Sequence, residues 1–432
     1  MSLTRRVGLQ MFRESDSSGT TRSVYAEWTL IAIAYIFAYL QRVSPQTIFD
    51  VLGRDFQISA EQIGIVASSY FYAYTVLQFP AGLLVDRFGV RRVIVASLII
   101  SSLGSFIFAV SPNIWFLCAG RILVALGDAV VFSCLIKFVA QRFRQERFGI
   151  MSGLSQISGY LGGILATTPL AVVVAIVGWR GSFIGLSLIS ICNAALCIAF
   201  LKGAPRSSEA SPIMKASQLI RISVSKIGGW GCAIVFATFF STATSFAGVW
   251  GIPMLMHSYQ LPQTMAGSIM ALFMIGTAVG SFAIGYVSDK LSQVRLALAL
   301  SCVARCLLFV IIAPFVVGQH WSPAATIAVV MLGFVGGGTV PLLLKFMRTT
   351  YGVAAIGTGA ALNATLGGLV AAVAQWFFGR ILDSYSSVRL DGGAHVFPPA
   401  AYDALIVALA TISLAGLLGV AMMPNERSAD IA

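Results

Sequence analysis

The sequence is short of charge. Lysine, arginine, aspartate and glutamate make up 10% of its 432 residues, whereas 58% of the residues are hydrophobic. Soluble domains carry about 25% charged residues, so this composition excludes a single soluble domain. The apolar residues form long continuous runs, and a membrane β-barrel would show short alternating strands instead. The composition therefore predicts an all-α, polytopic membrane protein.

Other absences narrow the function. No Gly-x-x-x-x-Gly-Lys-Ser/Thr phosphate loop is present, so we do not expect ATP as the energy source. The three histidines, His257, His320 and His395, are far apart, and the seven cysteines lie inside apolar runs without metal-ligand spacing. No nucleophile–base pair stands out. We expect neither an enzyme nor a cofactor nor a metal.

The apolar runs are long enough to cross a bilayer, which takes about 20 helical residues. Twelve such segments are predicted, at 28–49, 61–84, 93–112, 114–140, 149–177, 182–201, 229–256, 264–287, 294–318, 323–346, 354–380 and 401–423. An even number of spans places both termini on one side of the membrane. Lysines and arginines are concentrated in the connectors and tails on that side. By the positive-inside rule, both termini are expected in the cytoplasm.

The net charge of +12 needs no nucleic-acid partner, because this topology and anionic headgroups account for it. The longest polar stretch between spans lies between the sixth and seventh. The expected organisation is a cytoplasmic tail (1–24), a six-helix bundle (25–202), a cytoplasmic linker (203–226), a second six-helix bundle (227–424) and a tail (425–432). The first tail has no apolar core, so a cleaved secretory signal is not expected.

A charged connector occurs twice. "GLLVDRFGVRR" (82–92) follows the second predicted span, and Gly285-Tyr-Val-Ser-Asp289-Lys follows the eighth. A duplicated six-helix unit explains this repeat and is common in transporters whose halves rock against each other. The glycine would permit close helix approach, the carboxylate could meet a helix N-terminus, and the cations could hold acidic groups or lipid phosphates. A solvated turn is the alternative. The predicted gating residues are Gly82, Asp86, Arg87, Gly89, Arg91, Arg92 and Asp289.

This connector resembles the loop 2–3 signature of the major facilitator superfamily. "AGRILVALGDA" (119–129) resembles the family's fourth-helix motif, and "GWRGSF" (178–183) resembles its junction between spans five and six. Residues 39–89 are similar to the organic-anion and sugar-acid symporters, although Gln41 stands at an acidic position of that pattern, before the retained Arg42. The resemblance implies alternating access, a monomer, and proton coupling through a carboxylate in span four, here Asp128.

Asp128 is the only carboxylate at the middle of a predicted span. A charge there costs about 2.5–3.5 kcal/mol on insertion scales, so it must be paired, hydrated or protonated. Arg121 is about 10 Å away along the same helix, too far for direct contact. We expect Arg42 as its partner, because spans one and four line the cavity in this superfamily. Asp128 is then a proton-coupling site or part of a structural ion pair.

Arg42 belongs to a polar stripe on the first span. Tyr35, Tyr39, Arg42 and Gln46 lie at i, i+4, i+7 and i+11, within roughly 60° of one another. Such a stripe should face water, and arginine binds carboxylates or phosphates with two parallel hydrogen bonds. Arg42 is a predicted substrate ligand or a simple counter-ion of Asp128. The remaining predicted substrate-binding residues are Tyr35, Tyr39, Gln156, Tyr160, Asn363 and Arg305. For Gln156, Tyr160 and Asn363 a helix–helix hydrogen bond is the alternative, and for Arg305 a structural cation.

These features predict a secondary carrier in a bacterial inner membrane. The expected activity is proton-coupled uptake of a small anionic or zwitterionic metabolite: an organic acid, a sugar acid, an amino acid or a short peptide. The substrate, protons and the lipid bilayer are its expected partners. Proton-driven efflux of lipophilic cations is one alternative, and the buried arginines argue against it. A non-transporting sensor on a carrier fold is another.

Overall fold

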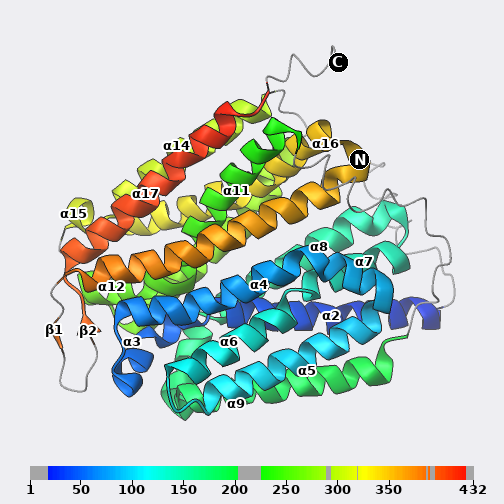
Figure 1. Ribbon diagram of the computed structural model, residues 1–432, viewed down its shortest axis with the longest axis horizontal. Helices are drawn as coiled ribbons and strands as arrows, with labels where there is room; N and C mark the ends of the chain where they lie inside the picture. Colours follow the sequence, from blue (N-terminus) through cyan, green and yellow to red (C-terminus); the bar gives the residue numbers. More distant parts are fainter. Residues whose placement is uncertain are drawn as a thin grey trace, which may run out of the picture.

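The computed structural model of the protein describes residues 18–202, 225–288, 293–318, 320–385, 388–389 and 395–424. Apart from a short antiparallel pair, β1 (Val388–Arg389) and β2 (His395–Val396), the regular elements of these residues are helices (Figure 1). Residues 1–17 of the first predicted tail (1–24), the second predicted tail (425–432) and most of the predicted linker (203–224 of 203–226) lie outside the described residues. Residues 18–24 of the first tail begin the helix that continues into the first predicted span. Below, the N-terminal half means residues 25–202 and the C-terminal half means residues 227–424.

The helices follow the apolar runs of the sequence. In and before the N-terminal half they are α2 (Ser18–Val43), α3 (Pro45–Phe56), α4 (Ala60–Phe88), α5 (Val90–Ala109), α6 (Ile114–Asp128), α7 (Val131–Arg142), α8 (Gln145–Leu165) and α9 (Thr168–Phe200). In the C-terminal half they are α11 (Ile227–Ser245), the π-helical η1 (Phe246–Trp250), α12 (Gly251–Tyr259), α13 (Gln263–Ser288), α14 (Val294–Ile311), α15 (Pro314–Val317), α16 (Pro323–Asp383) and α17 (Pro399–Ala421).

Ten stretches of the described residues are long and apolar enough to cross a membrane. The chain is therefore a multi-pass membrane protein. Two further long helices, α4 and α8, coincide with the predicted second and fifth spans and are richer in polar residues. Twelve spans stay a prediction.

Helix α16 contains two of these stretches, because it folds back on itself. Its 61 residues would extend about 92 Å if straight, about three times the thickness of the hydrocarbon core. Met347 and Asn363 would lie about 24 Å apart along a straight helix. The Asn363 amide nitrogen is nevertheless 3.1 Å from the Met347 sulfur. The two membrane-length stretches are Pro323–Met347 and Leu362–Asp383.

Several predicted spans are interrupted, which corrects their expected boundaries. The first predicted span ends early at Val43, and α3 starts at Pro45, whose ring nitrogen has no hydrogen to donate to the helix ladder. The predicted seventh span contains the π-helical segment η1, a feature frequent at functional sites. The predicted fifth span is broken after Leu165. Within α9 the backbone turns at Gly178, whose φ of 73° favours glycine.

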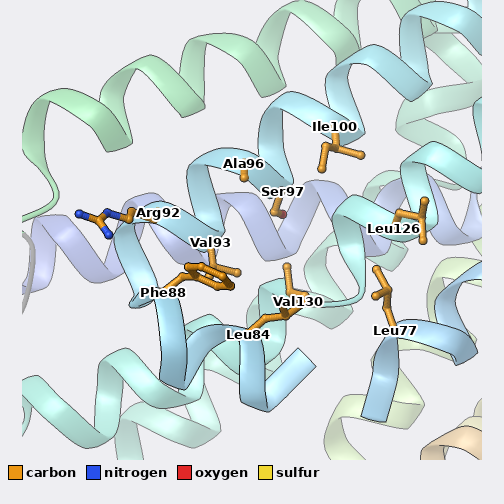
Figure 2. A pocket seen from close by; sticks show the side chains of 10 residues that line it. All are labelled: Leu77, Leu84, Phe88, Arg92, Val93, Ala96, Ser97, Ile100, Leu126 and Val130. Carbon is orange, nitrogen blue, oxygen red and sulfur yellow. The ribbon is translucent and has the colours of Figure 1, made fainter. Parts of the chain in front are cut away.

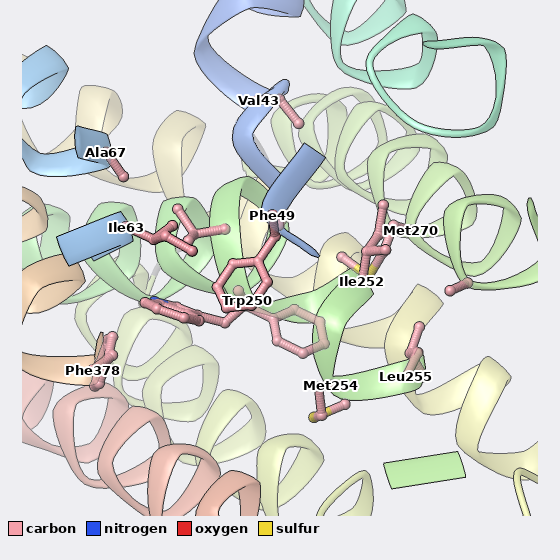
Figure 3. Close-up of a cluster of buried hydrophobic side chains, with 14 of the residues drawn as sticks. Val43, Phe49, Ile63, Ala67, Trp250, Ile252, Met254, Leu255, Met270 and Phe378 are labelled. Atoms are coloured by element: carbon pink, nitrogen blue, oxygen red, sulfur yellow. The ribbon is translucent and has the colours of Figure 1, made fainter. Parts of the chain in front are cut away.

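The first turn of α2 and the last turn of α17 lie toward one end of the molecule, and α3, α12 and the β1–β2 pair lie toward the other (Figure 1). We call the latter the distal end. There, buried apolar side chains from both halves form one cluster, including Phe49 of α3, Ile63 of α4, Trp250 of η1 and Phe378 of α16 (Figure 3). The rings of Phe49 and Trp250 pack edge to face at 5.3 Å. Apolar burial thus joins the halves at this end.

Polar contacts reinforce the distal junction. The carboxylate of Asp383, at the end of α16, accepts hydrogen bonds from the backbone N–H groups of Ala60 (3.0 Å) and Glu61 (2.7 Å). A side chain of one half therefore caps a helix of the other, at the terminus whose dipole favours an anion. His257 of α12 contacts the Asp50 carboxylate of α3 at 3.1 Å. These bonds hold the halves together at the distal end.

Candidate functional site

A buried polar network occupies the N-terminal half. Its centre is Asp128, the last residue of α6, whose side chain is 4% exposed. Tyr70 of α4 donates a hydrogen bond to one carboxylate oxygen at 3.2 Å, and Ser101 of α5 donates to the other at 3.1 Å. No cation of the described part of the chain lies within ion-pair distance of this carboxylate. Two neutral hydroxyls satisfy Asp128 instead.

Arg42 of α2 meets the network through Tyr70. Its Nε donates to the Tyr70 hydroxyl at 3.4 Å, and its guanidinium lies over the rings of Tyr39 (5.0 Å) and Tyr74 (4.6 Å). The direct Arg42–Asp128 pair expected from the sequence is absent, because the Tyr70 hydroxyl lies between the two groups. The terminal nitrogens of Arg42 make no hydrogen bond to any described residue. Arg42 is buried at 8% exposure, so these terminal nitrogens are donors that a ligand reaching the network could use.

A second arginine supports the network from α6. Arg121, only 2% exposed, donates to the backbone carbonyl of Gln41 at 2.6 Å and lies 4.6 Å from the centre of the Tyr70 ring. The Gln41 side chain donates to Ser101 at 3.0 Å and accepts a hydrogen bond from Ser105. Gln41, the departure from the family pattern, is therefore a neutral link to the Asp128 carboxylate.

The charge balance indicates what the network can do. Arg42 and Arg121 provide two positive charges and Asp128 at most one negative charge, so a buried positive charge is left over. Buried charge is costly unless it is compensated. An anion at the open face of Arg42 would compensate it, and protonation of Asp128 would increase the need for that anion. Such a network can couple the binding of an anion to the binding of a proton.

Aromatic side chains form a wall beside Arg42. Tyr39 packs edge to face against Tyr35 (6.1 Å) and against Tyr160 of α8 (6.2 Å). Tyr160 in turn interacts with Gln156 on its own helix and with Ser281 of α13 in the other half. The structure thus gathers five predicted substrate residues into one region. Tyr35 is itself buried at 6% exposure and contributes mainly packing.

The two predicted residues of the C-terminal half lie apart from this network. Arg305 of α14 is 1% exposed, donates to the Cys302 sulfur at 3.6 Å and lies 5.6 Å from the Phe239 ring centre. Its Nε and one terminal nitrogen have no hydrogen-bond partner in the described part of the chain, and the same holds for the Asn363 side-chain oxygen. Among the described residues, no contact joins either side chain to Asp128 or Arg42.

Sequence reasoning missed Ser101, Ser105 and the role of Arg121. The signal was present: Ser97, Ser101 and Ser105 recur every fourth residue of the third predicted span, so they share one helix face. Arg121 was set aside because it is too far from Asp128 along its own helix. Its actual partner, the Gln41 carbonyl, is on another helix.

The charged connector between α4 and α5 is described in part. Gly89 separates the two helices with a φ of 79°, and Arg91 donates to the Ile198 carbonyl of α9 at 2.6 Å. Arg87 lies over the Phe88 ring at 5.4 Å. The close helix approach expected at Gly82 is wrong, because a Cβ there would meet no atom within 4 Å. The Asp86 side chain and Asp289 lie outside the described residues.

Comparison with known proteins gives relatives that are named as transporters of small molecules, among them two sugar-acid transporters. A sialic acid transporter of Escherichia coli (strain K12) is 22% identical over 91% of this chain and 94% of its own length. A hexuronate transporter of Bacillus subtilis (strain 168) is 24% identical over 43% of this chain and 44% of its own length. Five of the curated relatives are matched over only 38–61% of their own length.

Solved structures share the fold. A bacterial homologue of the human lysosomal transporter Spinster, in an inward-facing and unoccupied conformation, superimposes with a TM-score of 0.73 at 13% identity, covering 96% of this chain and 98% of that one. A nucleoside transporter variant gives a TM-score of 0.70 at 15% identity, over 93% of this chain and all of that one. The model of the Major Facilitator Superfamily matches residues 31–375. The chain belongs to this transporter superfamily, as the resemblance of its connector and fourth-helix motifs implied, and not to a family of enzymes.

Proposed function

We propose that the protein is a secondary active transporter that takes up a small organic anion of the sugar-acid or organic-acid class together with a proton. The observation that carries this proposal is the link from Arg42 through Tyr70 to Asp128. One end of the link is an arginine with open donors, and the other is a buried carboxylate that can exchange a proton. The names of the sialic acid and hexuronate relatives support the substrate class.

The proposed coupling follows from charge balance. A proton on Asp128 leaves two arginines without a counter-ion, and an anion at Arg42 then restores the balance. Once the anion has left toward the cytoplasm, the extra positive charge favours release of the proton from Asp128. Anion and proton therefore travel together. Amino acids and short peptides carry a carboxylate and belong to the same proposal as second choices.

The proposed architecture is twelve spans in two pseudo-symmetric bundles, with both termini in the cytoplasm of a bacterial cell and the protein, as a monomer, in the inner membrane. The distal end then faces outward. The buried cluster around Trp250 and the Asp383 cap on α4 support an inward-facing state with a closed outer side. The two bundles would rock about this junction, and the gating connector would close the opposite side.

A ligand screen tests the substrate class. The purified protein is heated with hexuronates, other small carboxylates, amino acids, dipeptides and lipophilic cations. A ligand at about 100 times its dissociation constant adds about 2.7 kcal/mol of stability, which raises the melting temperature by a few degrees. We expect a carboxylate to stabilise the wild type and to lose this effect in Arg42→Gln.

The matched control is Arg54→Gln, which removes an exposed arginine of α3 at the distal end. It should keep the stabilisation by the same ligand. Stabilisation by lipophilic cations alone would contradict anion uptake and favour an efflux function. An unchanged response of Arg42→Gln would show that Arg42 serves only as a charge within the network.

A further inference from the structure

A groove lies outside the polar network, on the side of the N-terminal half. It is a groove of about 510 Å³ between α4, α5 and the α6–α7 junction, within the range of small-molecule sites. Leu84 and Phe88 of α4 form one wall, and Val93 and Ile100 of α5 form another (Figure 2). Phe88 is 47% and Ile100 37% exposed, so the groove opens at the surface of the molecule.

The groove is apolar along its length and charged at one end. Ser97 lines it, but the serine hydroxyl is bonded to the Gly127 carbonyl at 2.8 Å and is not available. Arg92 is the only charged side chain among the described residues that line the groove. Figure 2 shows Arg92 at one end and Ile100, Leu126 and Leu77 toward the other. A ligand for this site has a long apolar part and an anionic head.

Arg92 is free to bind that head. Its neighbour Arg91 is held by the Ile198 carbonyl, whereas Arg92 makes no hydrogen bond or ion pair with the described residues. Helix α5 begins at Val90, and no side chain caps its first turn. The backbone N–H groups of that turn add partial positive charge beside Arg92.

The bilayer supplies a ligand of this shape. The groove follows α5 from Arg92 to Ile100, about 12 Å along the helix, within the membrane-length stretch Val90–Ala109. Lipid acyl chains surround such a stretch, and basic residues at its cytoplasmic end attract anionic headgroups. We propose that the groove binds an acyl chain of an anionic phospholipid, whose headgroup phosphate lies on Arg92.

The position of the groove gives this lipid a role in the transport cycle. Its walls include Phe88 and Arg92, which belong to the connector 82–92, and α4 and α5 line it from opposite sides. A chain inserted between these helices would oppose their closer packing. Anionic lipid would then favour the arrangement seen here over any arrangement in which the groove closes.

Native mass spectrometry of the full chain tests the site. The probes are dioleoyl phosphatidylglycerol, which is anionic, and dioleoyl phosphatidylcholine, which is zwitterionic. We expect one retained phosphatidylglycerol and a preference for it over phosphatidylcholine of about fivefold, the value of one arginine at an anionic surface. Arg92→Gln should bind both lipids equally, and Ala96→Phe, which fills the groove, should retain neither.

Two matched variants separate this site from general effects. Arg144→Gln removes an exposed arginine that does not line the groove, and Leu103→Phe enlarges an exposed side chain of α5 outside the groove. Both should behave as wild type. If Arg144→Gln loses the preference for phosphatidylglycerol as much as Arg92→Gln does, the preference comes from surface charge in general. If Ala96→Phe still retains lipid, the lipid does not bind in the groove. If dioleoylglycerol, which lacks a phosphate, is retained as well as phosphatidylglycerol, the assignment of the headgroup to Arg92 is wrong.

Discussion

The two halves of the molecule differ in the groups that their buried charged side chains contact. In the N-terminal half, Arg42, Arg121 and Asp128 are joined through Tyr70 and Gln41 into one hydrogen-bonded network. In the C-terminal half, Arg305 is equally buried, and its one hydrogen bond to a described residue goes to the Cys302 sulfur. Like Arg121, it keeps two nitrogens without a partner among the described residues. The buried arginines of the two halves therefore differ in the groups that they bond, not in the number of their unused donors.

Close backbone packing is common to both halves: in the N-terminal half, a Cβ at Gly104 would lie 2.5 Å from the backbone nitrogen of Val124. The C-terminal half packs α13 against α16 in the same way. The backbone of α13 at Gly276 and Gly280 lies against the backbone of α16 at Val330 and Phe334. Its hydroxyl groups at Thr238, Thr242 and Thr277 bond to carbonyls of their own or preceding turns. Under the proposed function, the proton is carried by the N-terminal half, where Asp128 lies, and Arg305 would contribute to binding of the anion.

The largest expected effect follows from removing the carboxylate of the N-terminal network. Asp128→Asn keeps the hydrogen-bonding shape but cannot take up and release a proton. An inward gradient of one pH unit supplies about 1.4 kcal/mol per proton, enough for about tenfold accumulation of the anion. In proteoliposomes the variant should lose this accumulation and keep exchange of labelled for unlabelled substrate. Asp55→Asn, at a carboxylate bonded to Trp179, should keep both activities. Unchanged accumulation in Asp128→Asn would show that another group couples transport to the proton gradient.

The next effect is on the packing of the C-terminal half. A Cβ at Gly280 would lie 1.9 Å from the Phe334 carbonyl oxygen, so Gly280→Ala must separate α13 from α16. We expect a loss of about 1–3 kcal/mol in unfolding free energy, measured as a lower melting temperature. Gly153→Ala meets no atom within 4 Å and should leave the melting temperature nearly unchanged. Equal behaviour of the two variants would mean that α13 and α16 are not tightly packed.

A pair of arginine variants sharpens the comparison between the halves. Arg305→Met removes buried donors without partners, and we expect it to raise the unfolding free energy by about 1–3 kcal/mol. Arg121→Met removes two such donors as well, but it also breaks the 2.6 Å bond to the Gln41 carbonyl, and we expect the loss of that bond to lower the unfolding free energy. Chemical denaturation of both variants measures this difference in sign. If Arg305→Met also reduces stabilisation by the transported anion, Arg305 is a second ligand; if Arg305→Met is destabilising, the contrast between the halves fails.

The smallest effect concerns the junction between the halves. Asp383→Asn weakens the cap on the first turn of α4, at a cost of about 1 kcal/mol. Amide hydrogen exchange at Ala60 and Glu61 should accelerate about fivefold, the equivalent of that energy. Asp403 caps Phe315 within the C-terminal half, so Asp403→Asn should accelerate exchange at Phe315 and not at α4. Unchanged exchange at α4 in Asp383→Asn would show that the Asp383 cap does not stabilise the distal end.

Much of the site could be predicted from single helices. The stripe of Tyr35, Tyr39 and Arg42 and the isolated Asp128 are visible because helical periodicity and the rarity of charge in apolar runs are local properties. The predicted direct ion pair between Arg42 and Asp128 is wrong, because the Tyr70 hydroxyl lies between the two groups. No pattern within one helix shows this. The distal cap of Asp383 on α4 joins residues 323 positions apart and had no sequence signal.

The sequence by itself determined that this chain is a helical membrane protein, since uncharged runs of this length are stable only in a bilayer, where a helix satisfies its own backbone. Its motifs were also enough to identify the superfamily. Only the tertiary structure decided which charges meet, because a hydrogen bond across helices depends on how α2, α4, α5 and α6 are rotated against one another. Packing at particular side chains sets that rotation, so the unbonded terminal nitrogens of Arg42, the hydroxyls on Asp128 and the groove beside Arg92 became visible only in three dimensions.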